Sequence, residues 1–466
     1  MSYMVVSSNA GPKVVAKTLF GVTVGLQIVV LLVQGTLFAG HMGSRERTSA
    51  TLDFHRNSPE SVAAKVFGLI FGSAWFEWAV FFFLFVVELF FVFSIDITVS
   101  QILLMNVSLI LSGAFFHTVA ATIALSSSTR KRRNPFGLIL LFIFLGGPFI
   151  FYHLFTISSP FFSHLLGFTA IGYVTSDKAF YFSGHFYTMK APLIVMQAAT
   201  QIPLFWLMIN GMRRIFRMPN SPVWSKSDLL CFCTFLFFMV AGFFVAGVQD
   251  FDALTEHRGY YYYPRSFDAF YGQELFTYGV LYVGAGIGMA LFCIPDYFKR
   301  SKYILHTKKG LVRKSIFDDG ATGFFAILVY MIIGGVFLIP YVLVGKGMVQ
   351  NALVGILLLS SYVFAFAGFL EFFRLGPFRK NKIFLFTTMV LWWGIFPWMI
   401  GLMSGQDDNA LTFLSPFFGL AYFVASITDE VSVNMSAPIL PFFICGLIWA
   451  LAYQQHLLVK AKASPD

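Results

Sequence analysis

The sequence predicts an all-α polytopic membrane protein of about eleven transmembrane helices, arranged as two parallel repeats plus a linking helix. The composition, a series of long apolar segments and an uneven distribution of basic residues support this prediction. Of the 466 residues, 58% are hydrophobic, only 12% are charged, and the mean hydropathy is +0.75. Because soluble proteins carry about 25% charged residues, the composition argues against a soluble enzyme or a nucleic-acid-binding protein.

Long apolar segments recur along the whole chain. A helix needs about 20 mostly apolar residues to cross the hydrocarbon core of a bilayer. Eleven segments meet this length, although 66–95 is overlong and the stretches 158–189 and 404–436 are ambiguous. The predicted spans cover residues 18–39, 66–95, 100–125, 135–157, 190–212, 229–249, 275–297, 322–345, 350–374, 383–403 and 437–458.

Basic residues distinguish the two sides of the predicted membrane domain. One set of connections, which includes clusters at 45–56, 130–133 and 299–314, holds 24 of the 32 lysines and arginines, whereas the opposite set holds 7. Cytoplasmic loops carry the excess of positive charge, so the first set is predicted to be cytoplasmic. The N-terminus is then outside and the C-terminus inside, which requires an odd number of spans. The net charge of +10 therefore indicates orientation in a lipid bilayer rather than a polyanionic partner.

The two halves of the chain show the same order of predicted features. The sequence Ser159-Pro160-Phe161-Phe162 recurs as Ser415-Pro416-Phe417-Phe418, and each copy follows a basic turn and one span. Parallel repeats are a known transporter architecture. We therefore predict a first unit at 1–220 with about five spans and a second at 221–466 with about six, including the linking helix 229–249. That helix either connects two five-helix units or begins a six-helix unit whose N-terminal counterpart has lost its own first helix.

A charged segment follows the first predicted span on the predicted cytoplasmic side. It combines a Glu-Arg cluster, a Thr-Leu-Asp step and a Ser-Pro pair: Arg45, Glu46, Arg47, Thr48, Thr51, Leu52, Asp53, Ser58, Pro59 and Glu60. This pattern resembles the connector of type-2 ABC transporter permeases, the membrane-spanning subunits of ATP-driven export systems. The basic turn at 130–134 and the Ser-Pro segments are similar to further features of that family. Taken without the family, the segment is also consistent with a solvated loop that only joins two spans.

The resemblance implies that separate ATP-binding cassette ATPase subunits bind the connector, and that their closure moves the helix bundles. It also implies a bacterial cytoplasmic (inner) membrane and a multi-subunit complex that further membrane or periplasmic subunits can join. The chain has no G-x-x-x-x-G-K-[ST] phosphate-binding loop. ATP and Mg²⁺ are therefore expected on the partner subunit, with no cofactor, metal or catalytic residue in this chain. A second connector, which lacks the Glu-Arg cluster, is expected around Lys308, Lys309, Arg313, Lys314, Asp318 and Asp319.

Three carboxylates fall inside predicted spans, where an unpaired charge is costly. Glu77 and Glu88 are 11 residues apart and share one helix face at about 100° per residue. They predict a polar stripe along a conduit or at a subunit interface, or, for Glu77, a hydrated residue at the membrane boundary. Glu371 lies three residues before Arg374 and is predicted to pair with it.

Other patterns are weaker. The four cysteines lie in apolar segments and lack the spacing of zinc ligands. His117 and His153 form a single candidate pair for axial haem ligation, where a quinone-oxidising bundle would have two. Gly284 and Gly288 form a G-x-x-x-G pattern, which predicts close helix packing.

These observations leave three hypotheses for the function. The first is an export permease of unknown substrate, and the second is a non-transporting anchor or scaffold subunit of an envelope or motility machine. The third is an ion-coupled secondary transporter that uses Glu77 and Glu88. A polar, closable path favours transport, whereas a sealed interior packed with aromatic side chains favours a scaffold.

Overall fold

The computed structural model describes residues 11–48, 57–91, 93–95, 97–126, 192–217, 223–249, 267–295, 297–308, 317–344, 349–376, 420, 423–424 and 439–462. All regular secondary structure within these ranges is helical. Several predicted features lie outside the described residues: the spans 135–157 and 383–403, both Ser-Pro segments, His153, Thr51, Leu52, Asp53, Lys309, Arg313 and Lys314.

Among the described residues, six helices are long and apolar enough to cross a membrane: Pro12–Glu46, Val99–Ser126, Glu274–Cys293, Phe324–Val344, Ala352–Leu375 and Pro441–Ala461. Each overlaps a predicted span, so the prediction of an all-α polytopic membrane protein is confirmed. Helices α12 (Pro192–Arg217) and α13 (Lys226–Gln249) overlap two further predicted spans, 190–212 and 229–249. The total of eleven spans and their arrangement as repeats stay predictions.

The predicted span 66–95 is divided rather than continuous. Helix α4 (Val62–Phe67) and the π-helix η2 (Gly68–Gly72) form one arm, which meets α5 (Trp75–Phe91) at an angle of 58°. The break follows Gly72 and contains Ser73 and Ala74. Sharp kinks concentrate at glycine and serine pairs and at π-helical turns, so the local sequence accounts for the bend.

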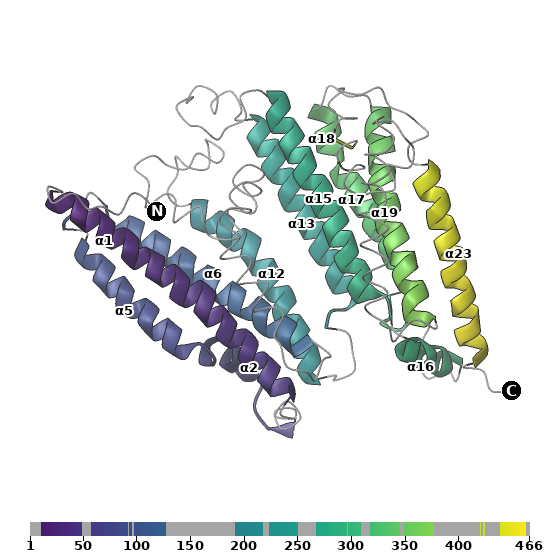
Figure 1. The fold of residues 1–466 in the computed structure, drawn as a ribbon, viewed down its shortest axis with the longest axis horizontal. Coiled ribbons are helices and arrows are strands. Elements are labelled where there is room, and N and C mark those ends of the chain that lie inside the picture. The colour runs from purple at the N-terminus through teal and green to yellow at the C-terminus, as the bar shows by residue number, and fades with distance from the viewer. Residues whose placement is uncertain are drawn as a thin grey trace, which may run out of the picture. The chain divides into compact units, whose positions relative to one another are not determined.

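The chain divides into two compact units, Met1–Val223 with Gln249–Gly259, and Trp224–Val248 with Tyr260–Asp466. The first unit begins with one continuous helix built from α1 (Pro12–Gln27), the π-helix η1 (Ile28–Gly35) and α2 (Thr36–Thr48). This helix packs against α5 and α6 (Val99–Ser126), and α12 packs on α6 (Figure 1). It exceeds the predicted span 18–39 because α2 continues through the charged residues of the connector.

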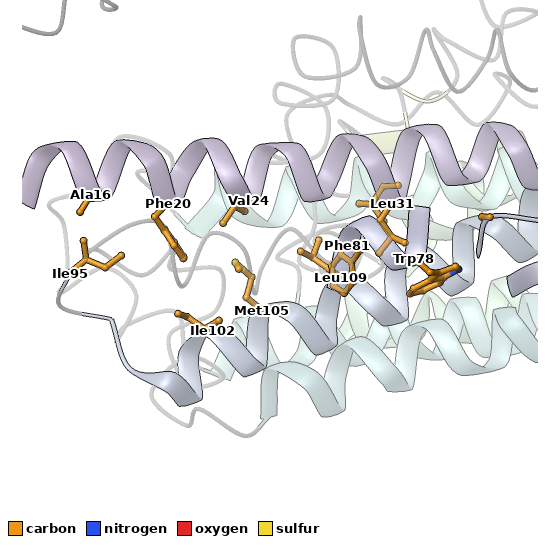
Figure 2. Close-up of a cluster of buried hydrophobic side chains, with 12 residues drawn as sticks. Ala16, Phe20, Val24, Leu31, Trp78, Phe81, Ile95, Ile102, Met105 and Leu109 are labelled. Carbon is orange, nitrogen blue, oxygen red and sulfur yellow. The ribbon is translucent and has the colours of Figure 1, made fainter. Parts of the chain in front are cut away.

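The core of the first unit is a cluster of apolar side chains from three helices. Side chains of α1 and η1 face those of α5 and α6 (Figure 2): Ala16, Phe20, Val24, Leu31, Trp78, Phe81, Ile102, Met105 and Leu109. The four residues of the first helix recur at three- and four-residue steps or their sums, so they share one face. Lipid is as apolar as these side chains, and close packing rather than transfer from water therefore holds the helices together.

The second unit is a bundle of α13, α15 (Phe267–Cys293), α17 (Phe324–Phe337), α18 (Ile339–Val344), α19 (Val349–Leu375) and α23 (Ile439–Lys462). Helices α15, α17 and α23 each pack on α19. The short helix α16 (Tyr297–Lys308) follows α15, contacts α23 and lies across the end of the bundle (Figure 1). Of the residues predicted for the second connector, Lys308 ends α16, and Asp318 and Asp319 lie in the segment before α17.

Aromatic side chains fill the interior of the second unit. Phe244 of α13 stacks on Tyr341 of α18 with 4.0 Å between the ring centroids. The hydroxyl of Tyr271 donates to the Tyr341 carbonyl at 2.6 Å, and the hydroxyls of Tyr282 and Ser360 are 2.7 Å apart. The rings pack tightly while their polar atoms are hydrogen-bonded within the bundle, as buried tyrosines require.

Glycines mark the closest approaches between helices. Within the described residues, a Cβ at Gly284 or Gly288 would meet nothing within 4 Å, whereas a Cβ at Gly286 would lie 2.6 Å from Val363. The close face of α15 therefore contains Gly286 rather than the predicted pair. In the first unit, a Cβ at Gly35 would lie 2.5 Å from Nε2 of His117, so only glycine allows this approach of the first helix to α6.

Candidate functional site

The first predicted connector continues directly from the long first helix. Arg45 is exposed and Glu46 is half-buried near the end of α2, which also contains Arg47 and Thr48. The second described part precedes α4, where Ser58 is half-buried and both Pro59 and Glu60 are exposed. Charged side chains at both ends of the connector are therefore open to solvent or to a partner.

Ser61, which directly follows Glu60, fixes the end of this connector. Its hydroxyl accepts a hydrogen bond of 3.2 Å from the Ala64 N–H and caps α4. Lys65 Nζ donates to the carbonyl of Ser58 at 3.2 Å. A serine followed by good helix formers is a sequence signal for such a cap, and it ties the connector to the start of the next helix.

Arg300 of α16 makes hydrogen bonds to two other parts of the second unit. Arg300 Nη1 donates to the Gly320 carbonyl at 2.7 Å, and Arg300 Nη2 is hydrogen-bonded to Nε2 of His456 on α23. We call this arrangement of Arg300, Gly320 and His456 the Arg300 anchor. It joins α16 both to the segment that precedes α17 and to the last helix of the bundle.

Glycine allows α16 to approach so closely. A Cβ at Gly320 would overlap the Cβ and ring of Tyr303 on α16, and a Cβ at Gly323 would lie 2.6 Å from Ile294. Arg300 itself lies 5.6 Å from the ring centroid of Tyr303, within cation–π range. The contact between α16 and segment 317–323 is therefore steric as well as polar.

Buried charges from other helices surround the anchor. Lys226, at the start of α13, donates to the carbonyls of Ala321 at 2.8 Å and Thr322 at 3.0 Å. Both Lys226 and Glu371 are 2% exposed, and Glu371 acts electrostatically on Lys226 and on Arg300. Four helices and one connecting segment thus meet through charged groups at this end of the second unit.

Burial changes the acid–base behaviour of this cluster. It lowers the pKa of the Lys226 ammonium from 10.5 to about 8, and the nearby Glu371 opposes the shift. Burial also lowers the pKa of the Arg300 guanidinium, again against the influence of Glu371. The predicted connector residues Asp318 and Asp319 are half-buried in the same segment, and Asp319 also acts on Lys226. Each cation is therefore desolvated, which makes its remaining hydrogen bonds more important.

The predicted partner of Glu371 has other contacts. Arg374 donates to the carbonyl of Ile294 and, at 2.9 Å, to that of Leu291, which closes the end of α15 against α19. A direct Glu371–Arg374 ion pair stays a prediction. Neither Lys226 nor Arg300 was distinguished by the sequence from other basic residues, because burial of a charge near a helix end leaves no local pattern.

The carboxylates predicted inside the membrane are buried. Glu77 is 3% exposed and Glu88 is 0% exposed, both on α5. Glu88 Oε2 accepts a hydrogen bond of 2.7 Å from Asn106 Nδ2 of α6, and Gln27 of α1 lies against both residues. Glu88 was predicted from the sequence but its amide partners were not, although a polar residue inside an apolar span is itself a signal of such pairing.

A second set of polar residues joins α6 and α12. Gln197 Nε2 donates to the carbonyl of Ser108 at 3.0 Å and to the hydroxyl of Ser112 at 2.9 Å. Gln201 Nε2 donates to the same Ser112 hydroxyl at 3.2 Å. Gln197 and Gln201 of α12 thus face α6.

Within the described residues, no three His, Cys, Asp or Glu side chains are grouped so that they could hold a metal ion. Nε2 of His117 lies 2.9 Å from the carbonyl oxygen of Leu31, so this nitrogen is a donor to the backbone.

Comparisons of the chain with protein-family models, with curated proteins and with solved structures found no match. The resemblance to type-2 ABC permeases therefore rests on sequence motifs.

Proposed function

We propose that this protein is the membrane-spanning permease subunit of an ATP-driven export system, with ATP hydrolysis on separate ATP-binding cassette subunits. The Arg300 anchor is the observation that supports the proposal most strongly. A short basic helix that lies across the end of a bundle, and is fixed to two other elements, is suited to transmit a push from a partner.

Hydrogen bonds from α16 to neighbouring elements would carry its movement into the bundle. Force on α16 would act through Arg300 on the Gly320 carbonyl, immediately before α17, and on His456 of α23. Lys226 holds the same segment to the start of α13. Movement of α16 would therefore displace several helices together rather than bend one loop.

The proposed setting follows the distribution of charge. Eleven spans would place the N-terminus outside and the C-terminus in the cytoplasm of a bacterial inner membrane, with both connectors facing the cytoplasm. The two units would act as a parallel pair, and the exposed Arg45 and Glu60 would meet one ATPase while α16 meets another. The substrate would pass between helices of the membrane domain.

One observation favours the scaffold alternative. The interior of the second unit is filled by stacked aromatic rings, including Phe244 on Tyr341, which leaves this bundle well packed. An anchor subunit of an envelope or motility machine would use the same connectors to receive ATPase movement without passing a substrate. An ion-coupled transporter that uses Glu77 and Glu88 is the third alternative, and it requires no ATPase.

The proposal is tested by purifying the tagged full chain in a gentle detergent and identifying every chain that accompanies it. We expect an ATPase with a phosphate-binding loop, and ATP hydrolysis that depends on its presence. An active complex that contains no such chain would overturn the proposal. ATP-dependent movement of a substrate into or out of reconstituted vesicles would then separate the permease from the scaffold.

A further inference from the structure

A closed ring of three polar side chains lies inside the first unit. Gln27 of α1, Glu88 of α5 and Asn106 of α6 are 0%, 0% and 3% exposed. They lie among the helices whose apolar side chains form the core in Figure 2, next to Phe81 and Met105. Because water is excluded here, the donors and acceptors of the ring have to match one another.

Asn106 has a fixed orientation. Its Nδ2 donates to the carbonyl of Ile102 at 2.9 Å and to Glu88 Oε2 at 2.7 Å. A backbone carbonyl can only accept a hydrogen bond, so the nitrogen has to be on that side. The oxygen Oδ1 of Asn106 therefore faces Gln27 as an acceptor.

The orientation of Gln27 follows from that of Asn106. Its Nε2 donates to Asn106 Oδ1 at 3.0 Å and lies 3.5 Å from the carbonyl of Phe81. The other atom of the Gln27 amide, its oxygen, then lies 2.7 Å from Glu88 Oε1. Turning the amide over would give Glu88 a donor and would let the Gln27 oxygen accept from the Phe85 N–H at 3.2 Å. It would also set that oxygen 3.0 Å from Asn106 Oδ1, so two acceptors would face each other.

Two oxygens 2.7 Å apart without a proton between them would repel each other, and the amide of Gln27 carries no proton on its oxygen. The proton therefore belongs to Glu88. The ring then closes in one direction: Glu88 O–H to Gln27 Oε1, Gln27 N–H to Asn106 Oδ1, and Asn106 N–H to Glu88 Oε2. We propose that Glu88 is a proton-binding site, protonated in this conformation, and that loss of the proton reverses the Gln27 amide.

The surroundings leave the two amides as the partners of Glu88. The other titratable groups described on the three helices are Lys13 and Lys17 on α1, Glu77 on α5 and His117 on α6, and α12, which packs on α6, carries Arg213, Arg214 and Arg217. Lys17, Glu77 and His117 are at least 10 residues from the nearest ring member on their own helix, or about 15 Å along it. No cation among these residues takes the place of the proton.

The helix around Gln27 is also irregular. The π-helix η1 begins at Ile28, immediately after Gln27, and π-helical turns occur frequently at functional sites. Its Leu31 carbonyl accepts a hydrogen bond from His117 on the opposite helix. A π-helical turn beside the ring gives the first helix a place at which a small change in the Gln27 amide can alter its path.

The test is infrared spectroscopy of the purified full chain in detergent at neutral pH. Glu88→Gln should remove a carbonyl band of a protonated carboxyl group, and this band should remain in the same-helix control Glu77→Gln. Loss of a carboxylate band in Glu88→Gln, with no loss of a carboxylic-acid band, would overturn the proposal.

Stability provides a second measurement. The amide of Glu88→Gln can donate to Gln27 and accept from Asn106 as protonated Glu88 does, so the variant should match the wild-type melting temperature at acidic pH, where unfolded glutamate is also protonated. As the pH rises above the ordinary pKa of glutamate, unfolded wild type loses this proton while the folded protein keeps it, so wild type should lose stability relative to Glu88→Gln. If Glu88→Gln does not fold, the single variant Gln27→Met, which keeps Glu88, provides the test. It should shift the frequency of the carboxylic-acid band, and an unchanged spectrum would contradict the proposal.

Discussion

The two units use buried polar groups in different ways. In the first unit, amides, hydroxyls and a carboxyl group lie within the helices, in the ring of Gln27, Glu88 and Asn106 and in the α6–α12 contact. In the second unit, tyrosine and phenylalanine pack the helix interiors, a cluster of charged groups lies at one end around Arg300, and a further carboxylate, Glu274, is buried on α15.

This difference also bears on the predicted repeat. Parallel repeats preserve the order of spans, but they need not preserve the side chains that fill each bundle. The two predicted connectors also differ in how exposed their charged side chains are. In the first unit the described connector residues Arg45 and Glu60 are exposed, whereas in the second unit Arg300 is 8% exposed and bonded on both sides. Three sets of substitutions test this contrast.

The largest effect is expected from Arg300→Ala. Removing the guanidinium leaves the Gly320 carbonyl without its donor and frees α16 from α23, which should cost about 1–3 kcal/mol. The population of detached α16 should rise by roughly 5–150-fold, and hydrogen exchange of the α16 amides should accelerate accordingly. The exposed neighbour Lys302→Ala is the matched control and should leave the exchange unchanged. Equal protection of α16 in Arg300→Ala and wild type would show that the anchor does not hold the helix.

A pH effect of intermediate size is expected from Lys226. Its pKa is about 8 in the folded protein and 10.5 when unperturbed. Below pH 8 both states hold the proton and the cost of burying the charge is fully present, whereas above pH 10.5 neither state holds it. Lys226 should therefore favour folding more as the pH rises through this window, by roughly 3 kcal/mol at most.

The measurement is the difference in thermal stability between wild type and Lys226→Met from pH 7.5 to about 10.5. Because both proteins contain the other titratable groups, including Glu88, the pH effects of those groups cancel in this difference. It should grow in favour of wild type with rising pH. A difference that stays constant would show that Lys226 keeps its ordinary titration in the fold.

Effects of similar size are expected at two glycines, and these compare the two units directly. Gly35→Ala in the first unit and Gly286→Ala in the second place a Cβ 2.5 Å from His117 and 2.6 Å from Val363. Each should cost about 1–3 kcal/mol through overpacking. The matched controls Gly25→Ala and Gly284→Ala meet nothing within 4 Å and should gain up to about 1 kcal/mol in helix stability. Equal melting temperatures within each pair would contradict these close helix approaches.

The sequence predicted the coarse architecture well because hydropathy is a property of whole segments. Glu88 could be found as a carboxylate in an apolar run, and the all-helical membrane class followed from the long spans. The bend after Gly72 could not be separated from an overlong span, because both produce the same apolar stretch. Arg300 and Asn106 were missed because their roles depend on contacts more than 15 residues away in the chain, with Gly320 and Glu88.

The central claim is that α16 receives an ATPase, and site-specific photo-crosslinking tests it most directly. A photoreactive amino acid at the exposed Lys302 of α16 should capture, in intact cells, a partner chain that contains a phosphate-binding loop. The same group at Leu343, which is 78% exposed and lies at the predicted outer end of its span, should not capture that chain. Efficient crosslinking at Lys302 that yields no nucleotide-binding partner would contradict the account.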